Sequence, residues 1–263
     1  MDVRGILDDL VAEHDALDPV VAGLAPDDWT TPTPSPGWTV ADQIAHLTFF
    51  DRAATRAIGD PTAFETERDQ LIEDVIAAGG SMDGPTLDWS RGLPADELLA
   101  EWRRGRAELV SAALTLAPDT RVPWYGPSMG AKSFLTARLM ETWAHGQDVV
   151  DALGATREVG DRLAHIARLG VITRGWSYAN RGLEPPDVEV RVELTLPSGA
   201  PFESGPPEAA ALVAGSAEDF CLVVTRRRHP DDTRLRVDGA AAADWMRLAQ
   251  AFAGPPSEGP PRR

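Results

Sequence analysis

Residues 131–153, AKSFLTARLMETWAHGQDVVDAL, are the stretch that decides the fold. Apolar side chains recur there at helical spacing and cover much of the circumference of the predicted helix: Phe134, Leu135, Ala137, Leu139, Met140, Trp143, Val149 and Val150. A helix that is apolar on so many sides is expected at the centre of a bundle, with other helices packed around it. The stretch therefore predicts a helical bundle built around residues 131–153.

Two of the polar residues in this helix form a pair of interest. Glu141 and His145 are four residues apart, so their side chains share one helix face. On an exposed helix such a pair is usually a simple hydrogen bond and is a weak signal for a metal. In a central helix, however, an isolated carboxylate is costly to bury and requires a partner charge or a metal ion.

A second helix is predicted from the stretch PGWTVADQIAHLTFFD, residues 36–51. Thr39 and Asp42 form a capping-box pattern at its start, and His46 lies among apolar residues in its second or third turn. One interpretation is a buried neutral imidazole bonded to a backbone carbonyl. The other is that His46 joins Glu141 and His145 as ligands of a divalent metal, with a coordination position left open for catalysis. The remaining histidines, His14, His165 and His229, are poorer candidates by their charged or loop surroundings.

The rest of the chain divides into a helical part and a strand-containing part. Helical periodicity extends over residues 3–23, 62–78, 94–116 and 157–180. After Pro185 and Pro186 the pattern changes to alternation, which predicts strands at 188–196, 200–204 and 233–238 and helices at 207–213, 216–227 and 240–252. We expect an α+β protein with a bundle at 1–183, a small α/β domain at 184–254 and a disordered tail at 255–263.

Composition excludes several classes of function. The formal net charge is −16, which argues against a nucleic-acid-binding surface. No apolar run approaches the ~20 residues that span a bilayer, and the start of the chain is acidic where a signal peptide is basic, so we expect a cytoplasmic protein with no membrane partner. The single cysteine, Cys221, is expected to be a buried core thiol.

Some further residues have two interpretations each. Arg138 and Asp148 lie three residues from Glu141 and His145, so they either support the metal site or contact substrate, or form surface ion pairs. The run Arg226, Arg227 and Arg228 is either solvated surface or includes a ligand contact. Aromatic residues that either line a pocket or anchor packing are Trp124, Tyr125 and Trp176.

The segments PGWTVADQIAHL and ETWAHGQDV together resemble the mycothiol-dependent maleylpyruvate isomerase family. These are DinB-like metal-binding proteins of actinobacteria with a small α/β domain, similar to sterol carrier proteins, after the bundle. The resemblance spans nearly the whole chain and implies that His46, Glu141 and His145 bind zinc. It also implies a substrate-carboxylate contact at Arg226, although VVTRR replaces the usual W-L-x-G-R-like ending here. The segments VPWYGPSMGAKSF and RGWSYANRGLEPP resemble a distinct actinobacterial subgroup.

These observations support one leading hypothesis and two alternatives. The leading one is a metal-dependent isomerase or transferase in which the ion binds mycothiol as a thiolate, and the thiolate adds to a small electrophilic substrate. In it Arg226 holds a substrate carboxylate, Arg138 or Asp148 assists, and Cys221 is not the nucleophile. The alternatives are a thiol-independent zinc-type hydrolase or isomerase and a non-catalytic metal-binding protein.

Overall fold

The chain has the predicted α+β architecture, divided between two compact units. The computed structural model describes residues 2–262. Unit 1 extends to Arg157 and unit 2 begins at Glu158. We expected the helical part to continue to residue 183, but residues 158–183 belong to unit 2. Because this segment is helical, no change in composition marks the boundary.

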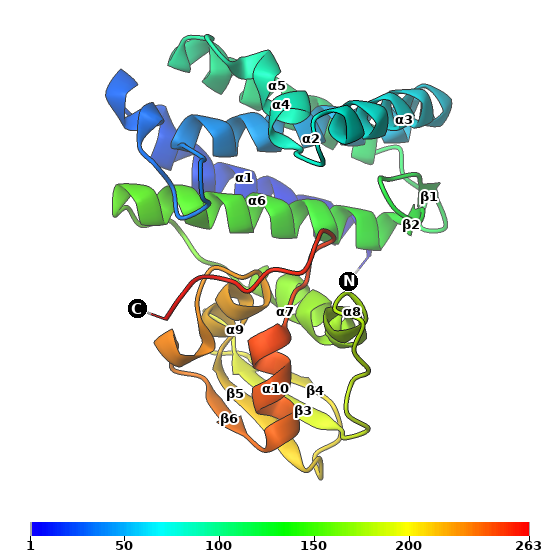
Figure 1. The fold of residues 1–263 in the computed structure, drawn as a ribbon, viewed down its shortest axis with the longest axis vertical. Coiled ribbons are helices and arrows are strands. Elements are labelled where there is room, and N and C mark those ends of the chain that lie inside the picture. The colour runs from blue at the N-terminus through cyan, green and yellow to red at the C-terminus, as the bar shows by residue number, and fades with distance from the viewer. Residues whose placement is uncertain (1, 263) are drawn as a thin grey trace. The chain divides into compact units, whose positions relative to one another are not determined.

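Unit 1 is the helical bundle. Figure 1 shows its long helices α1, α2, α5 and α6, with α3 and the short α4 beside them. The helices predicted at 3–23, 62–78, 94–116 and 131–153 are confirmed within a few residues at their ends. The elements of unit 1 are α1 (Val3–Ala22), η1 (Pro26–Thr30), α2 (Val40–Gly59), α3 (Pro61–Ala77), α4 (Asp83–Leu87), η2 (Asp88–Ser90), α5 (Ala95–Ala113), β1 (Arg121–Val122), β2 (Met129–Gly130) and α6 (Ala131–Leu153).

Helices α2 and α6 carry the residues of interest and are both anchored in the core. The capping box of α2 is present, because Thr39 and Asp42 exchange side-chain and backbone hydrogen bonds. Helix α6 ends at Gly154, whose φ of 58° is the left-handed conformation of a C-terminal cap. Side chains of α1, α2, α5 and α6, including Leu17, Leu47, Trp102 and Val149, meet in one buried cluster. Burial of each large apolar side chain stabilises the fold by about 1.5–3 kcal/mol.

A short hairpin precedes helix α6. Strands β1 and β2 pair in antiparallel fashion, with Arg121 opposite Gly130 and Val122 opposite Met129. Strands of two residues are too short to produce a readable alternation in the sequence. The hairpin presents Trp124 and Tyr125 at its turn.

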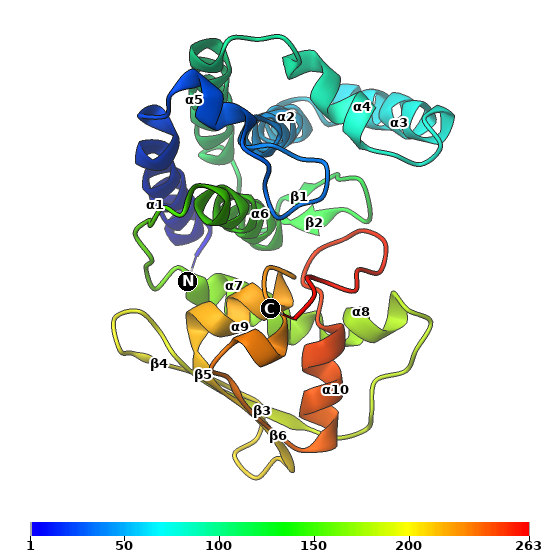
Figure 2. The same ribbon diagram turned by 60° about the vertical axis from the view of Figure 1, so that its left-hand side comes forward.

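Unit 2 combines a small mixed sheet with helices. Figure 2 shows α9 and α10 on the same face of this sheet. The strand order is β4-β3-β5-β6, in which β3 and β5 are parallel and the outer pairs are antiparallel. Its elements are α7 (Leu163–Ile172), α8 (Arg174–Ala179), β3 (Val190–Thr195), β4 (Pro201–Ser204), β5 (Ala211–Ser216), α9 (Ala217–Val224), η3 (Pro230–Asp232), β6 (Arg236–Asp238) and α10 (Ala240–Leu248).

Two secondary-structure predictions in unit 2 are wrong. The helix expected over 157–180 is two helices, α7 and α8, separated at Thr173. In place of the helix expected at 207–213, residues 207–210 form a turn and strand β5 begins at Ala211 and pairs with both β3 and β6. The alanine-rich segment EAAALVAG favours a helix locally, but pairing with two neighbouring strands overrides that preference.

The C-terminal tail makes specific hydrogen bonds, although we expected disorder. The carbonyl oxygen of Ser257 accepts hydrogen bonds from Arg181 and Arg226. The side-chain amide of Gln250 donates to the carbonyl of Pro255 at 3.2 Å. Among the described residues, no helix combines the length and apolar character needed to cross a membrane.

Candidate metal centre

Three side chains from two helices meet in unit 1. His46 on α2 and Glu141 and His145 on α6 each offer one ligand atom, and these atoms all lie within 4.8 Å of one another. The two imidazole ring centres are 4.3 Å apart, and His145 Nε2 is 3.1 Å from Glu141 Oε2. The prediction that the spacing in α6 and the separate His46 converge is therefore confirmed as geometry.

The donor set of this cluster fits a divalent metal ion. Two imidazole nitrogens and one carboxylate oxygen are the ligands that zinc and similar ions accept in proteins. Tetrahedral coordination with bonds of about 2.0 Å places two ligand atoms about 3.3 Å apart, close to the 3.1 Å between His145 and Glu141. Three protein ligands would leave at least one coordination position open.

Gln43 fixes the orientation and tautomer of His145. This side chain is fully buried, and its Oε1 lies 2.6 Å from His145 Nδ1. The hydroxyl of Thr33 donates to the carbonyl of Trp38, so its oxygen accepts from Gln43 Nε2 at 2.9 Å. The amide oxygen of Gln43 must then face His145, and an amide oxygen only accepts. Nδ1 of His145 therefore carries a proton, and Nε2 faces Glu141.

Gln43 was not among the predicted site residues. A signal was available, because Gln43 precedes His46 by three residues and interrupts an apolar helix face. A buried amide in that position needs hydrogen-bond partners, and a nearby histidine is one of the few side chains that provide them.

Glu141 is ionised at neutral pH. Burial by itself would raise the pKa of Glu141, but the hydrogen bond with His145 and the positive charges of protonated His145 and His46 and of Arg138 lower it to about 2. A metal ion that replaces the protons of the two imidazoles would supply the positive charge that stabilises this carboxylate.

Aromatic rings form one side of the cluster. The Trp38 ring centre is 5.1 Å from that of His46 and 5.8 Å from that of His145, and its plane is within 20° of the His145 ring. The indole N–H of Trp38 donates to the exposed carboxylate of Asp83 at 3.2 Å. Phe50 lies 4.6 Å from His46 on the same helix. These rings shield the two imidazoles from water on that side.

Arg138 and Asp148 are buried, so the alternative of surface ion pairs is wrong for both. Arg138 is 3% exposed and donates to Asp51 at 2.8 Å, and Asp51 lies 3.8 Å from His14. Burial lowers the pKa of His14 to about 4 despite the nearby Asp51. Asp148 accepts a hydrogen bond of 3.0 Å from Ser35 in the loop before α2. Arg138 therefore supports α6 from within the core, and Asp148 holds that loop.

Arg226 lies in unit 2, directly after α9. Its backbone φ of 62° is left-handed, and its guanidinium donates to the carbonyls of Arg247, Leu248 and Ser257. Burial lowers the pKa of Arg226 to about 10. Within α9, Cys221 is fully buried, and burial raises the pKa of its thiol well above its usual value. The cysteine is the buried core thiol that we expected.

Trp124, Tyr125 and Trp176, which either line a pocket or anchor packing, belong to different units. Trp124 stacks on Phe64 with ring centres 5.6 Å apart, and Tyr125 is 5.5 Å from Phe50. Burial raises the pKa of Tyr125 to about 12, so it stays neutral. Trp176, on α8 of unit 2, is 42% exposed. Trp124 and Tyr125 therefore pack as a group that reaches His46 through Phe50.

The sequence and the fold of this chain are similar to those of known proteins. Residues 10–150 match the family described as the mycothiol maleylpyruvate isomerase N-terminal domain. Two proteins of Mycobacterium tuberculosis, strains CDC 1551 and H37Rv, both named as uncharacterized, are 45% identical over 252 residues, which is 95% of this chain and 96% of each relative. Crystal structures of the mycothiol-dependent maleylpyruvate isomerase and of a point mutant match with a TM-score of 0.58 at 18% identity, covering 100% of this chain and 98% of theirs. The structural match shows a shared fold.

Proposed function

The chain belongs to the mycothiol maleylpyruvate isomerase family, and from this we propose that it is a metal-dependent enzyme that uses mycothiol for isomerisation or S-transfer on a small electrophilic substrate. The observation that carries this proposal is the convergence of His46, Glu141 and His145 within 4.8 Å. A site with two imidazoles, one carboxylate and an open position suits catalysis better than a structural role.

Different side chains have different roles in the proposed site. His46, Glu141 and His145 would hold the ion, which we propose to be zinc. When bound, such an ion supplies Lewis-acid chemistry that stabilises a thiolate near neutral pH. Gln43 keeps His145 Nε2 directed at the site through the bond at Nδ1. Trp38 and Phe50 keep water from one side, which strengthens the attraction between opposite charges within the site.

The assisting residues act at a distance from the chemistry in this proposal. Arg138 and Asp148 contact Asp51 and Ser35, so they position α6 and the loop before α2. Arg226 remains the proposed contact for a substrate carboxylate. To make that contact, its guanidinium would exchange hydrogen bonds with backbone carbonyls for charge-assisted bonds with the substrate, which are stronger.

Metal content tests the first part of the proposal. We expect the purified protein to contain stoichiometric divalent metal by elemental analysis, and His46→Ala and Glu141→Gln to lose it. His165→Ala is the matched control, since His165 lies on α7 in unit 2 and is outside the cluster. Full metal retention in both cluster variants would contradict the proposed site.

Thiol dependence tests the second part. With metal present, the consumption of electrophiles such as maleylpyruvate should require mycothiol and should be lost in Glu141→Gln. Activity that survives removal of all low-molecular-weight thiols would instead favour metal-activated water or direct carbonyl polarisation, which the same ligand set permits. Metal binding without turnover on any thiol and electrophile pair would favour a non-catalytic protein.

A further inference from the structure

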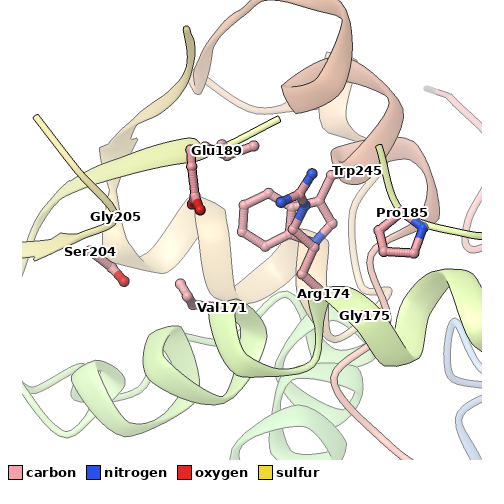
Figure 3. A pocket seen from close by; sticks show the side chains of 9 residues that line it. Val171, Arg174, Gly175, Pro185, Glu189, Ser204, Gly205 and Trp245 are labelled. Atoms are coloured by element: carbon pink, nitrogen blue, oxygen red, sulfur yellow. The ribbon is translucent and has the colours of Figure 1, made fainter. Parts of the chain in front are cut away.

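Unit 2 contains a pocket that the proposed reaction does not use. Its volume is about 320 Å³, at the small end of the range for ligand pockets. Residues of α7, α8 and α10 form one side, and the ends of β3 and β4 form the other. Figure 3 shows the side chains of Arg174, Glu189 and Trp245 around this space.

Arg174 is a cation without a carboxylate partner. Acidic residues outnumber Lys and Arg by 41 to 25 in the chain, yet among the described residues Arg174 forms no ion pair. Its guanidinium makes one hydrogen bond, 3.2 Å long, to the carbonyl of Pro186, and its Nε is buried with no partner. A buried donor without a partner costs free energy, which an incoming acceptor would recover. The guanidinium therefore has capacity for an anionic group.

Glu189 supplies the opposite charge across the same pocket. Its side chain is exposed, and in the described part of the chain it forms neither a hydrogen bond nor an ion pair. Figure 3 shows its carboxylate to one side of the Trp245 ring, whereas the Arg174 guanidinium overlaps that ring in this view. Two opposite charges that line one pocket without pairing leave both available to a ligand that carries both charges.

The remaining walls are apolar or close-fitting backbone. The Trp245 ring lies 6.0 Å from the Arg174 guanidinium carbon, and Val171 and Pro185 line the pocket beside it. At the rim, Gly205 has a φ of +80°, and a Cβ there would lie 2.4 Å from the carbonyl oxygen of Val190. Only glycine permits this approach of β4 to β3 at the edge of the pocket. The apolar walls suit a short aliphatic side chain.

We propose that this pocket binds a small zwitterion of the amino-acid type. Arg174 receives the carboxylate, Glu189 receives the ammonium group, and the apolar part of the ligand rests against Trp245 and Val171. Carboxylate binding by a guanidinium is favoured because two N–H groups can bond to both oxygens at once. This site is separate from the cluster in unit 1 and does not depend on the reaction proposed there.

A matched set of three probes tests the ligand class on the unaltered protein. L-leucine carries both charges, N-acetyl-L-leucine lacks the ammonium group, and L-leucinamide lacks the carboxylate. By calorimetry or saturation-transfer NMR we expect L-leucine to bind with a Kd of roughly 1 mM, and each derivative about tenfold more weakly or worse. Equal binding of all three probes, or no binding of L-leucine, would overturn the proposal.

Three variants test the assignment of the residues. Arg174→Met should weaken L-leucine binding about tenfold or more, since it removes the carboxylate contact. Glu189→Gln should weaken L-leucine but strengthen N-acetyl-L-leucine, because it removes repulsion of the carboxylate. Arg168→Met, at an exposed arginine of α7 outside the pocket, should bind like the parent.

The exposed position of Glu189 makes its variant informative even if Arg174→Met folds poorly. Circular dichroism and thermal melting would establish whether each variant is folded. Unchanged probe preference in a folded Glu189→Gln variant would contradict the role of Glu189, and unchanged L-leucine affinity in a folded Arg174→Met variant would contradict that of Arg174.

Discussion

Several arginines with limited exposure are bonded in different ways in the two units. In unit 1, Arg138 pairs with Asp51 and Arg157 pairs with Glu13, each at 2.8 Å and each between different elements. In unit 2, Arg191 pairs with Glu203, but the half-buried Arg174, Arg181 and Arg226 donate to backbone carbonyls instead. Side-chain pairs fix the positions of both partners, whereas a carbonyl that loses its guanidinium can bond to water. Unit 1 is therefore arranged for a fixed geometry, and unit 2 keeps cations that can accept an anionic partner.

The largest expected effect concerns the buried pair of unit 1. Asp51→Ala leaves Arg138 as an uncompensated buried charge, and we expect the free energy of unfolding to fall by about 3–5 kcal/mol. Urea denaturation would measure it. The control is Asp8→Ala, which removes an exposed pair with Arg4 and should cost less than about 1 kcal/mol. A similar small loss in both variants would remove the contrast between the units.

The next effect is a loss of stability in mild acid. The folded-state pKa of His14, about 4, lies below its ordinary value of 6.5, so the unfolded chain takes up a proton first as the pH falls. Stability is full above about pH 6.5 and falls by roughly 2–3 kcal/mol between about pH 7 and pH 4.5. Denaturation at both pH values would show this. A His14→Gln variant should lose less over the same interval, and an equal loss would contradict the assignment to His14.

A smaller effect, on metal affinity, is expected from substitution of Gln43. This variant tests whether the hydrogen bond with Gln43 is needed to orient His145. Gln43→Leu removes the acceptor for His145 Nδ1, and we expect metal affinity to fall by about 10- to 100-fold. Competition with a chromogenic chelator would measure it. Gln70→Leu, at an exposed position of α3, is the control and should leave affinity unchanged. Unaltered affinity in Gln43→Leu would show that the packing of α6 alone orients His145.

The smallest expected effect is at Arg226. Arg226→Met should reduce the free energy of unfolding by only about 1 kcal/mol, because water can replace the guanidinium at the carbonyls of Arg247 and Leu248. Denaturation under the same conditions as for Asp51→Ala allows direct comparison. A loss as large as that of Asp51→Ala would show that unit 2 depends on its cations as strongly as unit 1 does.

The metal cluster was predictable because regular helices relate residue number directly to position. Four residues separate Glu141 from His145, and this spacing alone places them on one face. The convergence of His46 was inferred from burial. The charged neighbours of His14 in sequence suggest an exposed position, but His14 shares a helix face with Leu10 and Leu17 and is 2% exposed.

Features that depend on distant partners were not predictable. The partner of Arg138 is Asp51, which is far away in sequence and lies on another helix. Strand β5 forms because β3 and β6 pair with it, although its own residues favour a helix. Arg226 donates to carbonyls at the end of α10 and in the C-terminal tail, and no local sequence pattern indicates these contacts.

The position of Trp38 gives the protein a built-in optical reporter. Its indole is stacked at 5.8 Å on one proposed metal ligand and lies 5.1 Å from another. A cation arriving beside an aromatic face changes the electrostatic environment of that ring. Loading of the site should therefore be visible as a change in intrinsic fluorescence that is absent in Trp38→Phe, so occupancy can be followed in solution without any added dye.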